Sequence, residues 1–83
     1  MLLTAEQIRA ARALLGWSQP ELAAAAGLSM SSIRRIETPG GPARSKAGSL
    51  EAVRQTFEKA GVVFQASGEM VDGGPGVRLR HKG

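Results

Sequence analysis

Residues 18–37, with the sequence SQPELAAAAGLSMSSIRRIE, constrain the fold more than any other part of the chain. Ser18 and Ser29 each stand where a hydroxyl can accept a hydrogen bond from the first turn of a helix. Gly27 lies between the two helical patterns and can adopt the positive φ that ends a helix. The segment therefore predicts two short helices joined by a tight turn.

The apolar residues of this segment predict how the two helices pack. Two helices that cross steeply need a small residue where they meet, and Ala23 is suitably small. Ile33 and Ile36 are three residues apart, so they share one side of the second helix and bury it. Leu22 and Leu28 are suited to fill the angle between the helices. Together these features are the signature of a helix-turn-helix.

Two further helices and a strand pair are expected outside this segment. Thr4 and Gln7 form a capping box at the start of a first helix. After a loop at residues 38–48, Ser49 or Ser45 is expected to cap a last helix. The final segment changes to a strand pattern interrupted by turn residues. We expect helices at about 4–15, 18–26, 29–37 and 49–60, and short strands at about 62–66 and 76–80.

Composition narrows the class of function. A chain of 83 residues with a net charge of +4 is one small basic domain, which suits a polyanionic partner. It has no cysteine, and its single histidine, His81, cannot form a metal site alone, so neither metal nor cofactor is expected. No plausible acid, base or nucleophile set is present, and we expect no enzyme. No membrane partner is expected, and the polar first residues favour a cytoplasmic protein.

The segment resembles the helix-turn-helix of Cro and phage repressors, also called the XRE family. The resemblance extends over about residues 4–60 and is strongest in residues 17–37. The matching positions are Gln19, Leu22, Ala23, Gly27, Leu28, Ile33, Ile36 and Glu37. It implies a mainly α, lambda-repressor-like domain at 1–61, with residues 62–83 as a C-terminal strand pair and tail that is a candidate dimerisation element.

The resemblance also implies which residues bind double-stranded DNA. The third helix would lie in the major groove, as in other proteins of this type. Gln19 matches a position that contacts phosphate and braces the third helix. Arg12 and Glu37 match a structural ion pair between the first and third helices. The positions that correspond to base or phosphate contacts are Gln19, Met30, Ser31, Ser32, Arg34, Arg35, Arg44 and Lys46.

Several interpretations remain open at this point. The face with Met30 and Ser31 is ambiguous for base reading, so DNA shape is expected to contribute. Met30 is equally suited to packing, while Trp17 is read as a core residue. The leading hypothesis is a homodimeric repressor or autoregulator that is nucleoid-associated when it binds DNA. The alternatives are an antitoxin that also binds a toxin protein, and an adaptor that has lost DNA binding.

Overall fold

The computed structural model describes residues 3–65 and 76–79, and these residues form five helices and a two-stranded antiparallel sheet. The expectation of a mainly helical fold with a C-terminal strand pair is confirmed. The elements, in chain order, are α1 (Ala5–Leu15), α2 (Gln19–Ala26), α3 (Met30–Ile36), α4 (Gly41–Arg44), α5 (Ala47–Lys59), β1 (Val62–Gln65) and β2 (Gly76–Leu79).

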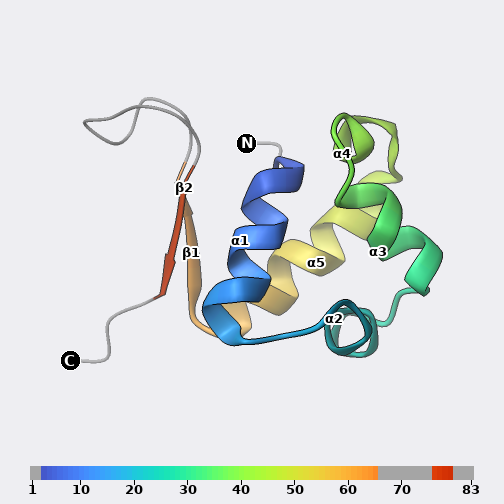
Figure 1. Cartoon of the computed structure of the whole chain (residues 1–83). Helices are drawn as coiled ribbons and strands as arrows, with labels where there is room; N and C mark the ends of the chain where they lie inside the picture. Colours follow the sequence, from blue (N-terminus) through green and yellow to red (C-terminus); the bar gives the residue numbers. More distant parts are fainter. Residues whose placement is uncertain (1–2, 66–75, 80–83) are drawn as a thin grey trace.

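Helices α1 and α5 form the centre of the molecule and separate the helix pair α2 and α3 from the strand pair (Figure 1). Figure 1 shows α2 and α3 on one side of this pair and the strand pair on the other. The largest fully buried side chains come from α1, α2, α3, α5 and β1: Ile8, Leu22, Ile33, Ile36, Val53, Phe57 and Val62. The core therefore holds the two short helices α2 and α3, which are too short to be stable alone.

The strand pair shares this core. Val62 of β1 is completely buried, and Phe64 meets Phe57 edge-on with 5.9 Å between the ring centroids. In the sheet, Val62 pairs with Leu79 and Phe64 pairs with Val77. Residue 61 therefore marks a change of secondary structure and not a gap in the core. The expected strand ends at 66 and 80 lie outside the described residues.

One expectation about the loop at residues 38–48 is wrong, because the loop contains a fifth helix, α4. Gly40 has a φ of +75° and redirects the chain, and Pro42 then occupies the first turn of α4. Proline is tolerated there, since the first N–H groups of a helix have no partner within it. Pro42, which lies in the expected loop, therefore stands at the start of a helix.

The expected cap of the last helix is also wrong. Lys46 occupies the N-cap position of α5, and no side chain caps the helix. The Ser45 hydroxyl instead donates a hydrogen bond to the carbonyl of Gly41, at 2.8 Å. Ser49 lies within the first turn. The first turn of α5 is thus left with backbone N–H groups that lack a side-chain acceptor.

Candidate nucleic-acid interface

Local hydrogen bonds define the frame of α2 and α3. The Ser18 hydroxyl accepts from the backbone N–H of Glu21, and the Glu21 carboxylate accepts from the N–H of Ser18 at 2.7 Å. Gly27 ends α2 with a φ of +69°, a conformation that a side chain disfavours. Ser29 then caps α3 by accepting from the N–H of Ser32 at 3.1 Å. Each contact joins residues three apart, so this frame is encoded locally.

Glu21 is electrostatically tuned by its cap. The hydrogen bond from the backbone N–H of Ser18 lowers the pKa of Glu21 below its ordinary value of 4.5, and the Ser18 side chain adds to the effect. Hydrogen bonds to the charged form of a carboxyl group favour that form. The capping box of α2 is therefore complete when Glu21 is ionised.

Helix α3 has two distinct sides. Ile33 and Ile36 are completely buried, as is Leu22 of α2, and Ala23 is 6 % exposed where the two helices meet. The exposed side chains of α3 are Ser31, Arg34 and Arg35. Burial thus orients α3 so that one serine and two arginines face outward.

The first-turn residues Met30 and Ser32 are less free than the sequence suggested. Met30 is half-buried and packs against the core. Ser32 is also half-buried, and its hydroxyl accepts a hydrogen bond from the Ser29 hydroxyl at 3.1 Å. Both side chains therefore have a packing or capping role, and the fully exposed part of the expected reading face is narrower.

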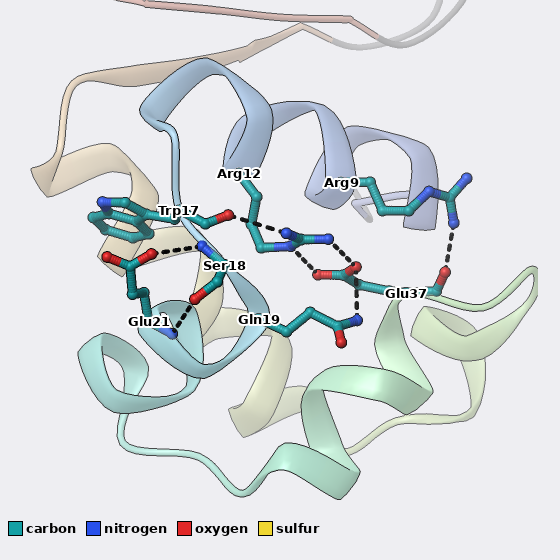
Figure 2. A network of polar contacts seen from close by, with 7 residues as sticks. All are labelled: Arg9, Arg12, Trp17, Ser18, Gln19, Glu21 and Glu37. Atoms are coloured by element: carbon teal, nitrogen blue, oxygen red, sulfur yellow. Dashed lines mark hydrogen bonds and ion pairs between the residues drawn. The ribbon is translucent and has the colours of Figure 1, made fainter.

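Glu37 follows the last residue of α3 and ties that end to the rest of the protein (Figure 2). Its carboxylate accepts two hydrogen bonds from Arg12, from Nε at 2.7 Å and from Nη2 at 2.9 Å. Gln19 at the start of α2 donates a third, from Nε2 at 3.2 Å. The carboxylate thus joins α1 and α2 to the end of α3. Arg12 and Glu37 are the ion pair that the family resemblance implies.

The surroundings of this ion pair keep it formed. The Glu37 side chain is only 4 % exposed, while Arg12 is 20 % exposed. The hydrogen bond to Glu37 raises the pKa of Arg12 against the smaller opposing effect of its burial. A third N–H of Arg12, on Nη1, donates to the carbonyl of Trp17 at 3.0 Å. Trp17 itself stacks on Phe57 with 5.8 Å between ring centroids, as expected of a core residue.

A recess of about 150 Å³ lies between α3 and the start of α5. Its lining is polar and cationic apart from one isoleucine: Ser32, Arg35, Ile36, Ser45, Lys46 and Ser49. The uncapped first turn of α5, which carries no acidic residue, lies at the same place. The structure therefore brings Arg35 and Lys46 together beside a helix N-terminus, a combination that attracts anions.

Arg44, the remaining expected contact, is exposed at the end of α4. Its guanidinium lies over Gly40, close enough that a Cβ at Gly40 would be 3.0 Å from Nη1. Next to it, Gly41 approaches α3 so closely that a Cβ there would be 1.7 Å from the carbonyl oxygen of Arg35. Gly41 therefore lets α4 pack directly on α3 and sets the position of Arg44.

The sequence did not single out Arg9 or Gly41. Arg9 donates from Nη1 to the backbone carbonyl of Glu37 (Figure 2). Its spacing of three residues from Arg12 places both arginines on one face of α1, and this spacing was the available signal. For Gly41 no local signal exists, because its neighbour is the backbone of another helix.

Comparison with known families agrees with this geometry. A family model described as helix-turn-helix matches residues 8–38, from the middle of α1 to just beyond α3. Residues 8–38 form a helix-turn-helix of the Cro/phage-repressor type. This places the protein among the DNA-binding transcriptional regulators. No curated protein matches the chain. Within the described ranges, every helix is too short or too polar to cross a lipid bilayer.

Proposed function

We propose that this helix-turn-helix regulator is a repressor or autoregulator that binds a pseudo-palindromic operator as a homodimer. The observation that carries the proposal is that α3 exposes Arg34 and Arg35 and that Arg35 also lines the recess with Lys46. Side chains that point into a groove and cations that meet the flanking phosphates are both required for specific binding. The mechanism is steric, because a bound dimer occupies the DNA that other proteins need.

In this proposal α3 lies in the major groove, and Ser31 and Arg35 read base edges. An arginine can donate two hydrogen bonds to one guanine, whereas a serine hydroxyl can pair with several different bases and so discriminates less. Met30 and Ser32 contribute less, since one packs on the core and the other bonds to Ser29. Shape readout then supplies the remaining specificity.

The phosphate contacts are proposed to flank α3 on both sides. Gln19 braces Glu37 and begins α2, and its backbone N–H suits one phosphate. It is the donor that remains in this first turn, because Pro20 has no N–H and the N–H of Glu21 is bonded to Ser18. Lys46, with the uncapped start of α5, suits a second phosphate, and Arg44 suits a third. We place this activity in the bacterial cytoplasm, at the nucleoid.

The first test separates base reading from phosphate binding. A preferred site is selected from random DNA and its affinity is measured by gel shift over a range of salt concentrations. Arg35→Ala should weaken the selected site by about 1–3 kcal/mol and leave random DNA nearly unaffected. Arg44→Ala should weaken both DNAs alike and reduce the salt slope by about one. An equal loss on both DNAs for Arg35→Ala would make Arg35 a phosphate contact.

The homodimer is proposed to form through the exposed edge of β2. This strand lies on the opposite side of α1 and α5 from α3 (Figure 1), so pairing there leaves the reading face free. Leu79 of β2 is 44 % exposed, and an unpaired strand edge readily pairs with a second strand. Two-fold pairing would place two recognition helices for half-sites about 34 Å apart.

A matched pair of leucines tests the dimer contact. Leu14 on α1 is 41 % exposed, which is close to the value for Leu79. In sedimentation equilibrium the intact protein should be a dimer, Leu79→Asp should shift it toward monomer, and Leu14→Asp should not. The reverse pattern would move the contact to α1. Deleting the strands is a poorer test, because Val62 is part of the core.

The alternative proposal is an antitoxin of a toxin–antitoxin pair, which binds a partner protein as well as DNA. The same exposed strand, with Arg78 on its outer face, would then contact the toxin. Co-purification of one small protein encoded by a neighbouring gene, lost in Leu79→Asp, supports the antitoxin. A protein that purifies alone as a dimer supports the autoregulator.

A further inference from the structure

The backbone at the end of α3 is held by Arg9 of α1, a residue that is not among the expected DNA contacts. Helix α3 has only seven residues, and its last carbonyl groups accept from the backbone N–H groups that follow the helix, those of Glu37 and Thr38. The next carbonyl, that of Glu37, accepts a hydrogen bond from Nη1 of Arg9 on α1 (Figure 2). Arg9 is exposed, and the two residues are 28 positions apart in the chain.

Arg9 and Arg12 hold the same residue at two different points. Arg12 grips the Glu37 carboxylate, which is separated from the backbone by rotatable bonds, whereas Arg9 grips the carbonyl itself. A carboxylate contact restrains the backbone only through the side chain. A second contact at the carbonyl restrains the backbone directly and adds to the packing of Ile36. A cation at the end of a helix is also favoured by the helix dipole.

This restraint acts on the residues that are proposed to read DNA. Arg35 is two positions before Glu37, and its own carbonyl accepts from the hydroxyl and the N–H of Thr38. A small tilt at this end of α3 would therefore move the Arg35 guanidinium. Paired hydrogen bonds to a base edge tolerate little displacement, while contacts to phosphate tolerate more.

We propose that Arg9 is a positioning residue for the recognition helix, acting through the Glu37 carbonyl and without contacting DNA itself. This inference rests on the proposed function, since it supposes a preferred DNA site. It assigns to α1 a role in specificity that is distinct from the structural ion pair of Arg12. Its consequence is that Arg9 raises the ratio of specific to non-specific affinity.

The test compares three full-length variants on a selected site and on random DNA. Arg9→Ala should weaken the selected site about three- to tenfold and change random DNA by less than about twofold, with the salt slope unchanged. Arg9→Lys keeps the charge and an N–H that can donate to the Glu37 carbonyl, so it should restore part of the ratio. Lys59→Ala removes a charge of the same sign at the far end of α5 and should leave both affinities unchanged.

Hydrogen exchange gives a second readout that does not depend on DNA. In Arg9→Ala the backbone N–H groups of Glu37 and Thr38 should exchange about three- to tenfold faster, with those of α2 unchanged. Unchanged exchange, or a ratio of affinities equal to that of the wild type, would overturn the proposal. So would a loss on both DNAs with a smaller salt slope, which identifies a phosphate contact. Failure of the wild type to select any site would refute the proposed function instead, and hydrogen exchange would still decide whether Arg9 holds α3.

Discussion

Replacing Arg12 with methionine should be among the most damaging single changes in this protein. The substitution keeps much of the apolar stem but removes two hydrogen bonds to Glu37 and one to Trp17. Glu37 would then retain its charge at a site where its side chain is 4 % exposed, with Gln19 as a weaker donor. The dominant cost is that of leaving a buried carboxylate without its cation.

The magnitude follows from burial. Removing one partner of a buried ion pair costs about 3–5 kcal/mol, and the 20 % exposure of Arg12 places this pair at about 3 kcal/mol. A domain of 83 residues has a total stability of roughly 4–12 kcal/mol. For a domain of this size the loss should lower the Tm by about 12–24 °C. Arg12→Met should therefore remain folded at low temperature and unfold early on heating.

Thermal unfolding followed by circular dichroism measures this loss, and two further variants identify its cause. Glu37→Gln removes the charge from the buried partner and should cost less, because the orphaned Arg12 can reach water. The double change of Arg12 and Glu37 to methionine should be more stable than Arg12→Met alone, since no unpaired charge remains. A fall in Tm of less than about 4 °C for Arg12→Met would show that the pair is effectively solvated and would refute the reasoning.

Two other predictions concern close packing and pH. Gly41→Ala should destabilise the protein by about 1–3 kcal/mol or more, because the new Cβ meets the Arg35 carbonyl, and it should also weaken DNA binding by displacing α4. Gly48→Ala is the matched control: nothing lies within 4 Å of its Cβ, and alanine in α5 should stabilise by about 0.5–1 kcal/mol. The lowered pKa of Glu21 means that its contribution to stability is present above pH 4.5 and is lost as the pH falls through the lower folded value. An NMR titration should place the Glu21 midpoint below 4.5. Ser18→Ala removes the hydroxyl and keeps the backbone N–H, so it should move the midpoint only part of the way back, and an unchanged midpoint would contradict the side-chain contribution.

The elements that the sequence predicts well are those defined by neighbours in the chain. Ser18, Ser29 and Gly27 act within three or four residues, and the structure has each in the expected conformation. The buried pair Ile33 and Ile36 follows from helical spacing in the same way. Local signals were weaker after α3, where proline was compatible with either a loop or the first turn of a helix. In the structure this segment forms the helix α4, and Gly41 of α4 packs directly against α3.

The candidate site was predictable in outline and not in detail. Helical spacing placed Arg34 and Arg35 on the outer side of α3, and both are exposed. Whether Met30 faces DNA or the core depends on what packs beside it, and spacing alone leaves both open. The partners of Ser32 and of Lys46 likewise depend on how the cap of α3 and the start of α5 are arranged.

By itself, the sequence determined the two capped helices, the turn at Gly27 and hence the type of motif. Caps, turns and apolar spacing are short-range properties that a chain carries wherever it folds. Only the tertiary structure decided that Arg9 donates to the Glu37 carbonyl, that Gly41 lies against Arg35, and that the first turn of α5 lies next to α3. These contacts join residues from different helices, and their geometry exists only once the common core has fixed how the helices cross.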